Sequence, residues 1–120
     1  MAQKNVIAEK SYQFALRIVK LYQFLIQEKK EFTLGKQILR SGTSIGANVA
    51  EAVGSQSKKE FRAKMSIAYK EILETNFWLN LLKDSKYIPE DLADSFLVDC
   101  EELAKISGKI LVTTTKSLNH

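Results

Sequence analysis

The stretch that decides the fold of this chain is residues 57–82, which reads SKKEFRAKMSIAYKEILETNFWLNLL. Apolar or small residues recur in it at alternating steps of four and three, at Phe61, Met65, Ala68, Ile72, Thr75, Leu79 and Leu82. This spacing puts them along one side of a helix and is typical of helices packed at about 20° to each other. Ser57 and Glu60 have the spacing of a capping box, which marks a helix start. The stretch therefore predicts a helix over about 58–84 and favours a helical bundle.

Three further helices are predicted from apolar residues spaced three or four apart, over about 6–28, 34–54 and 89–113. We expect Thr33 to cap the second of these helices and Pro89 to occupy the first position of the last. Because the connections are short, neighbouring helices must run antiparallel. We predict one all-α domain over the whole chain, an antiparallel up-down-up-down four-helix bundle.

The composition agrees with long helices, because the chain has one proline and five glycines, too few for a turn-rich β fold. Cys100 is the single cysteine, which favours a reducing compartment. It lies among periodic apolar residues and indicates core packing, with a nucleophilic role as the weaker alternative. No run approaches the roughly 20 apolar residues of a membrane span. We expect a soluble, cytoplasmic protein that does not engage a membrane.

The sequence offers little material for catalysis. His120, the only histidine, lies in the terminal tail, where it cannot support a metal site or a Ser-His-Asp triad. Glu71 and Glu74 share one helix face but lack the histidines with which ferritin-like proteins bind metal. We predict no enzyme activity, no catalytic residue, no metal, no cofactor and no small-molecule substrate.

The second predicted helix is rich in small residues, since residues 41–47 read SGTSIGA. Each interior glycine costs about 1 kcal/mol relative to alanine. Gly42 and Gly46 therefore indicate close approach of another helix or another subunit. A loop across residues 41–46 is the alternative. Ile45 and Val49 keep the helical phase and favour a continuous helix.

A polar stripe runs beside the apolar face of the same helix, and its members are Gln37, Arg40, Ser44, Asn48 and Glu51. If the second and third helices pair antiparallel about their short connection, Arg40 comes level with Glu74. We predict that Arg40 bonds Glu71 or Glu74. A second pair is predicted between Glu51 and Lys64. Such pairs fix the helix register more than they add stability.

The outer face of the third helix, opposite its apolar seam, is basic in its first half and apolar in its second. The candidate phosphate contacts, including two residues on the outside of the first helix, are Arg17, Lys20, Lys59, Arg62 and Lys70. The candidate contacts to another subunit or a partner protein are Leu73, Phe77, Trp78 and Leu81. Exposed apolar area costs about 25 cal/mol per Å², which favours covering it. An ordinary solvated face is the alternative.

The net charge of +4 is unevenly distributed along the chain. Residues 1–87 contain fifteen basic and eight acidic side chains, whereas residues 88–120 contain three basic and six acidic ones. This asymmetry indicates either a polyanion-binding surface or an ordinary helix surface with an acidic last helix.

A longer motif resembles a known family. Residues 37–52 read QILRSGTSIGANVAEA, and KEF at 59–61 and IAYKE at 67–71 follow. Together they resemble the four-helix bundle family that includes proteins encoded in intervening sequences of bacterial 23S ribosomal RNA genes, which is similar to the accessory variability proteins of diversity-generating retroelements. The resemblance covers about residues 10–112. It implies a homo-oligomer, expected to be a pentameric ring, and in the retroelement relatives a basic surface that engages RNA, DNA or reverse transcriptase.

Two classes of function follow. The first is a nucleic-acid or ribonucleoprotein accessory module, whose partners would be structured RNA, DNA or a nucleic-acid-processing protein. The second is a protein-interaction scaffold that recruits its partner through Leu73 and Phe77, with the surface charge serving solubility.

Overall fold

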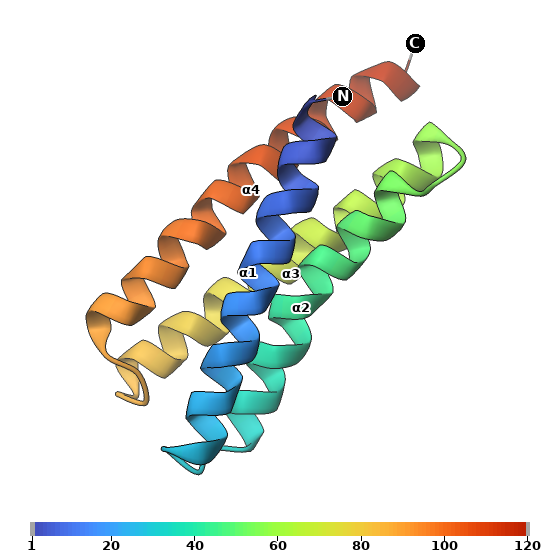
Figure 1. Ribbon diagram of the computed structural model, residues 1–120. Coiled ribbons are helices and arrows are strands. Elements are labelled where there is room, and N and C mark those ends of the chain that lie inside the picture. The colour runs from blue at the N-terminus through green and yellow to red at the C-terminus, as the bar shows by residue number, and fades with distance from the viewer. Residues whose placement is uncertain (1, 120) are drawn as a thin grey trace.

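Four helices make up the structure, a computed structural model that describes residues 2–119 and the side chains of residues 4–119. They are α1 (Ala2–Gln27), α2 (Thr33–Val53), α3 (Lys58–Asp84) and α4 (Glu90–Leu118). The helices run alternately up and down, so the N-terminus, the α2–α3 connection and the C-terminal turns of α4 lie at the same end of a rod of 51 × 21 × 20 Å (Figure 1). The predicted antiparallel four-helix bundle is confirmed.

Each helix packs against its neighbour in sequence, whereas α1 and α4 touch over a shorter stretch and α1 and α3 lie diagonally, with their backbones out of contact. The α1–α4 side is closed by a few specific contacts. The rings of Phe14 and Phe96 meet edge to face at 6.0 Å. Arg17 Nη1 donates to Asp99 Oδ2 at 2.6 Å. The fourth side of the bundle is therefore closed by an aromatic pair and an ion pair at the edge of the shared core.

The seam predicted for α3 forms the centre of the core. All of its residues are buried: Phe61, Met65, Ala68, Ile72, Thr75, Leu79 and Leu82. Fully burying a large apolar side chain of this kind stabilises the fold by about 1.5–3 kcal/mol. The one polar residue of the seam, Thr75, shares a hydrogen bond of 3.0 Å with the buried hydroxyl of Ser41 on α2, so burial leaves neither hydroxyl unpaired.

The small residues of α2 lie where α1 approaches most closely. A Cβ atom added at Gly42 would lie 2.7 Å from Cγ1 of Ile18. At Gly46 it would lie 3.3 Å from the backbone oxygen of Ser11. The helix is continuous from Thr33 to Val53, so the alternative of a loop across residues 41–46 is wrong. The predicted close approach at both glycines is confirmed, and the approaching element is α1.

The start of α3 has the predicted capping geometry. Ser57 has extended backbone angles, and its hydroxyl accepts from the amide of Glu60 at 3.0 Å. The Glu60 carboxylate in turn accepts from the amide of Gln56 at 3.3 Å, one residue earlier than in an ideal capping box.

Three other helix ends differ from the prediction. Thr33 is the first residue of α2 and caps nothing; the longer Glu31 side chain accepts from the Leu34 amide at 2.6 Å instead. Pro89 precedes α4 rather than opening it, because its ψ of 146° is extended. The first helix starts at Ala2, well before the predicted residue 6, since no helix breaker intervenes.

The last helix continues to Leu118, past the predicted end at residue 113. Its final turns are tied to α3 by two hydrogen bonds of 2.7 Å, from Lys58 to Ser117 and from Arg62 to Thr115. These contacts compensate for the weak helix propensity of three consecutive threonines. None of the helices between residues 2 and 119 is both long and apolar enough to cross a membrane.

Candidate nucleic-acid interface at the basic end of the bundle

Positive charge is concentrated where the chain start, the α2–α3 connection and the end of α4 meet. We call this surface, made of residues 4–8, 52–63 and 113–119, the basic end. Its charged residues are five cations and one carboxylate, namely Lys4, Lys58, Lys59, Arg62, Lys116 and Glu60. None of the five cations forms an ion pair with another residue that the structure describes. Their charge is thus available to an external anion.

Hydroxyl groups position two of these cations without neutralising them. Lys58 Nζ donates to Ser117 Oγ, and Arg62 Nε donates to Thr115 Oγ1, both at 2.7 Å. A hydroxyl carries no charge, so each cation keeps its attraction for phosphate while its side chain is held in place.

The opposite end of the bundle has no such excess. Residues 28–36 and 83–91 contain five basic and five acidic side chains. In the middle of the rod most cations face a carboxylate: Lys10 pairs with Glu102 at 3.2 Å and Lys64 with Glu51 at 2.9 Å. Positive charge is therefore unevenly distributed along the long axis of the rod, in addition to the difference between α4 and the rest of the chain.

The five predicted phosphate contacts do not form one surface. Lys59 and Arg62 belong to the basic end. Lys70 is exposed but lies eleven residues further along α3 than Lys59, about 16 Å away at 1.5 Å per residue. Lys20 is exposed on α1, a helix whose backbone is not in contact with that of α3.

Arg17 is engaged within the bundle. Besides its ion pair with Asp99, its Nη2 donates to Ser95 Oγ at 3.0 Å. Its guanidinium carbon lies 4.0 Å from the centroid of the Phe96 ring. A residue held by three partners on α4 is poorly placed to bind phosphate, and its evident role is to join α1 to α4.

Sequence reasoning missed Lys4, Lys58 and Lys116. Lys4 lies on α1 and Lys116 on α4, so the helical periodicity of α3 alone could not show that they lie near its first turn. The signal that could have found them was the antiparallel topology, which brings the start of α1, the start of α3 and the end of α4 to one end.

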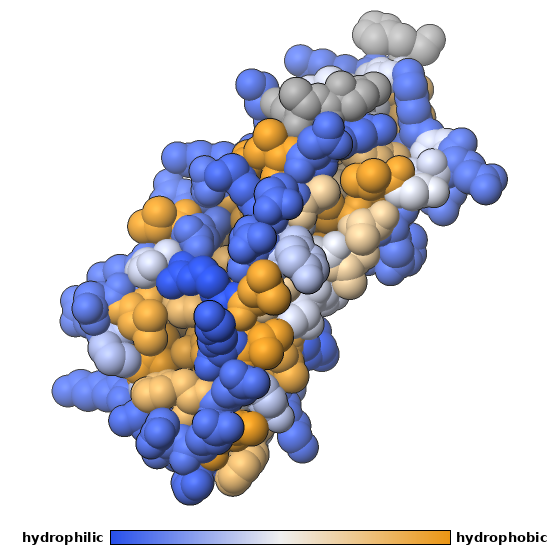
Figure 2. All heavy atoms as spheres, in the orientation of Figure 1, coloured by the Kyte–Doolittle hydropathy of each residue, from blue (hydrophilic) through white to orange (hydrophobic). Residues whose placement is uncertain are grey.

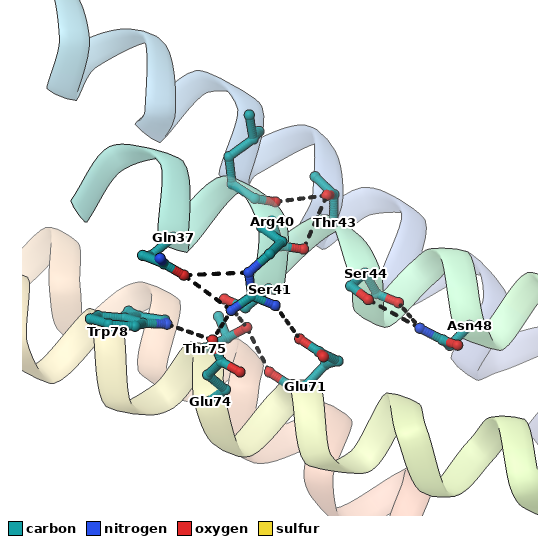
Figure 3. Close-up of polar contacts among 11 residues, drawn as sticks. Gln37, Arg40, Ser41, Thr43, Ser44, Asn48, Glu71, Glu74, Thr75 and Trp78 are labelled. Atoms are coloured by element: carbon teal, nitrogen blue, oxygen red, sulfur yellow. Dashed lines mark hydrogen bonds and ion pairs between the residues drawn. The ribbon is translucent and has the colours of Figure 1, made fainter. Parts of the chain in front are cut away.

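The polar stripe lies along the α2–α3 boundary, as Figure 3 shows. Arg40 bonds Glu74, and its Nη1 also lies 3.4 Å from Glu71 Oε2. Gln37 Oε1 accepts from Arg40 Nε at 3.3 Å, and Trp78 Nε1 donates to Glu74 Oε2 at 2.9 Å. The prediction that Arg40 bonds Glu71 or Glu74 is confirmed, and Arg40 pairs with both carboxylates.

The rest of the stripe extends the same boundary toward the basic end. The predicted pair of Lys64 with Glu51 is confirmed at 2.9 Å. Asn48 Nδ2 donates to the backbone oxygen of Ser44 at 2.8 Å, so these two members bond within α2. The stripe thus holds α2 and α3 in register through charges at two levels.

Two apolar patches remain on the outside of the bundle. The α3 patch consists of Leu73, Phe77 and Leu81, of which Leu73 is 53 % exposed and Phe77 59 %. Trp78 is half-buried and meets the Phe77 ring edge to face at 5.0 Å.

The α1 patch, which sequence reasoning missed, consists of Tyr12, Leu16 and Val19, all exposed. Figure 2 shows hydrophobic residues interrupting the polar surface over α1 and its boundary with α2. The signal in the sequence was the four-and-three spacing of these residues, which widens the apolar stripe of the first helix beyond what the core can cover.

Comparison with known proteins identifies the family. The model of the 23S rRNA-intervening sequence protein family matches residues 3–109. The chain belongs to this family. The family resemblance inferred from the sequence is thereby confirmed.

One solved structure is closely similar to this family member. It is a protein of unknown function from the S23 ribosomal protein family of Bacteroides thetaiotaomicron, 49 % identical, with 91 % of this chain and 97 % of that chain covered at a TM-score of 0.89. No curated protein matches the chain. The family match includes Lys4, Lys58, Lys59 and Arg62 but ends before Lys116, the last cation of the basic end.

Proposed function

We propose that this family member is a non-enzymatic nucleic-acid accessory protein, which acts as a homo-oligomer and binds structured RNA through the basic end. The observation that supports this most strongly is a group of five cations around a single carboxylate, none of which forms an ion pair within the described part of the chain. Lys and Arg contacts to phosphate supply most of the sequence-independent affinity for nucleic acid. The family name, which refers to an intervening sequence of 23S rRNA, makes structured RNA the first ligand to test.

Salt dependence gives the proposal a quantitative form. Each phosphate contact releases counterions and contributes about 0.7–0.9 to the slope of log affinity against log salt. Contacts from all five cations of the basic end would give a slope of about −3.5 to −4.5. Lys20 and Lys70, exposed but distant, would steepen the slope only with an RNA long enough to reach along the rod.

The deciding experiment measures binding to a structured RNA and to duplex DNA over a range of salt concentrations. The test variant replaces three cations of the basic end, Lys58, Lys59 and Arg62, with Gln. The matched control replaces three cations of the opposite end, Lys29, Lys36 and Lys86, with Gln. The expected result is a slope shallower by about two to three in the test variant and nearly unchanged in the control. Equal losses in both, or no binding by the unaltered protein at low salt, would reject the proposal.

A second function, a protein-interaction scaffold, is favoured by the exposure of Leu73 and Phe77. Its signature would be a partner complex that is insensitive to salt and lost in Phe77→Lys. We assign the α3 patch to self-association instead, because the α1 patch offers it a second apolar surface on the same chain. These two patches lie on helices that are diagonal in the bundle. Subunits joined patch to patch would therefore associate head to tail, the arrangement that closes into rings.

A further inference from the structure

A cavity of about 560 Å³ opens at the basic end, between the start of α1, the α2–α3 connection and the last turns of α4. Phe61 and Ile110, only 7 % and 5 % exposed, are its apolar residues. The polar residues around them are five hydroxyl residues, one amide and two lysines, namely Ser55, Ser57, Thr113, Thr114, Ser117, Gln56, Lys4 and Lys58. Its volume is typical of small-ligand sites, which occupy roughly 300–1,000 Å³.

No carboxylate of the described residues lines this cavity, and neither of its lysines has an acidic partner among those residues. Lys4 Nζ lies 4.5 Å from the centroid of the Phe61 ring. Lys58 Nζ bonds only the Ser117 hydroxyl. A cation–π contact and a bond to a neutral hydroxyl are both weaker than an ion pair with a phosphate, so an incoming anion would displace them.

Part of the polar wall is already occupied and part is free to recognise a ligand. The hydroxyls of Ser55 and Thr114 donate to backbone oxygens, and Ser57 caps α3. Thr113 makes no side-chain hydrogen bond in the described structure. A ligand that fits must combine a flat apolar part, polar edges and an anionic group. An acyl chain would fill the apolar floor but would make no use of the Gln56 amide and the Thr113 hydroxyl, which lie on the exposed rim of the cavity.

We propose that this cavity binds one unpaired nucleotide of an RNA, with the base against Phe61 and Ile110 and the phosphate bonded by Lys4 and Lys58. The inference rests on the proposed function, since it takes RNA as the ligand. It adds that the basic end recognises an unstacked base, which is how proteins commonly read single-stranded loops and ends.

The test is a titration of the full chain with adenosine 5′-monophosphate, adenosine and inorganic phosphate. In the unaltered protein the monophosphate binds at least tenfold more tightly than either fragment. Thr113→Phe fills the cavity without changing any charge and weakens monophosphate binding at least tenfold. Val112→Phe, one residue away on the exposed side of α4 and outside the cavity lining, leaves binding unchanged. The helical circular dichroism of both variants verifies that they fold.

Three results would overturn the inference: no binding of the monophosphate, equal binding by Thr113→Phe and the unaltered protein, or stronger binding of octanoate than of the monophosphate. Structured RNA separates this failure from failure of the proposed function. RNA binding that falls in the Lys58, Lys59 and Arg62 variant but is unchanged in Thr113→Phe rejects the nucleotide site and keeps the proposed function. Monophosphate binding that Thr113→Phe abolishes, with no RNA binding at low salt, rejects the proposed function and reassigns the cavity to a free nucleotide.

Discussion

Cys100 lies on the core side of α4, is 1 % exposed, and is next to Asp99 in the sequence. Burial, and to a lesser extent the charge of Asp99, raise the pKa of its thiol from 9.0 to about 12. At neutral pH the thiol is therefore protonated and a poor nucleophile, which agrees with core packing.

The raised pKa of Cys100 predicts a stability change at high pH. The thiol ionises near pH 9 in the unfolded chain but only near pH 12 in the folded one. The buried neutral thiol therefore contributes fully to the unfolding free energy below pH 9, and this contribution is lost as the pH rises from 9 towards 12. Between these values the unfolding free energy should fall more steeply in the unaltered protein than in Cys100→Val, by up to about 1.4 kcal/mol per pH unit. Urea unfolding at a series of pH values measures both curves, and parallel curves would contradict the assignment.

The ion pairs of Arg40 should contribute little to stability, although they were the most specific residue-level prediction to be confirmed. The Arg40 side chain is 51 % exposed, so solvent screens its charge. A double-mutant cycle with Arg40→Met and Glu74→Gln is expected to give a coupling of about 0.2–1 kcal/mol. A coupling well above 2 kcal/mol would show that the stripe stabilises the bundle as well as setting its register.

Arg40 and Arg17 show what sequence can reveal about single residues. The partner of Arg40 was predictable because a short connection fixes the register of α2 against α3. The partner of Arg17, Asp99, lies 82 residues away on a helix that α1 meets only through tertiary packing. No local pattern relates those two helices, so Arg17 was assigned to phosphate.

At the scale of the helices, the four glycines in helical segments do not contribute alike. Gly42→Ala would place a Cβ within 2.7–2.9 Å of Cγ1, Cγ2 and Cδ1 of Ile18. The two γ carbons can move away only if χ1 of this β-branched residue leaves its strongly preferred rotamer. We expect a net destabilisation of about 1–3 kcal/mol in spite of the better helix propensity of alanine.

Gly108→Ala is the matched control, because its Cβ would meet Tyr69 at an ordinary 3.8 Å. Propensity alone should then stabilise that variant by about 0.5–1 kcal/mol. Urea unfolding of the two variants tests the difference in sign. Stabilisation by both substitutions would mean that α1 and α2 can move apart without cost.

Helix interiors were predictable from the sequence and helix ends less so. The phase of the seam from Phe61 to Leu82 is fixed by many residues at once, so one irregular position cannot shift it. A cap depends on single side chains that compete for the same amide. At the start of α2 the Glu31 carboxylate reaches the Leu34 amide and displaces Thr33 from that role. The end of α4 likewise depends on tertiary bonds to α3.

The basic end is a property of the whole molecule. Its cations come from three separate parts of the chain, each with a modest local charge, and they meet because the topology alternates. The predicted basic face of α3 captured only Lys59 and Arg62 of this surface. Helical periodicity predicts which residues share a face of one helix. Which residues share an end of the bundle depends on how all four helices are arranged.

The arrangement of the two apolar patches predicts how copies of the chain associate. The α1 and α3 patches lie on diagonal helices, so a twofold contact through one of them would leave the other exposed. Head-to-tail association covers both. We expect the unaltered protein to be a homo-oligomer by light scattering. Two variants, Leu73→Lys with Phe77→Lys and Tyr12→Lys with Leu16→Lys, should each be monomeric.

Mixing these two variants distinguishes head-to-tail from twofold association, because each retains the patch that the other lacks. Head-to-tail contacts predict that the mixture forms a one-to-one dimer and nothing larger, since the remaining patch on each partner is broken. A twofold contact through the α3 patch predicts instead that the α1 variant dimerises without the other. Light scattering of each variant alone and of the mixture measures all three masses. A mixture that stays monomeric would contradict a subunit interface formed by the α1 patch against the α3 patch.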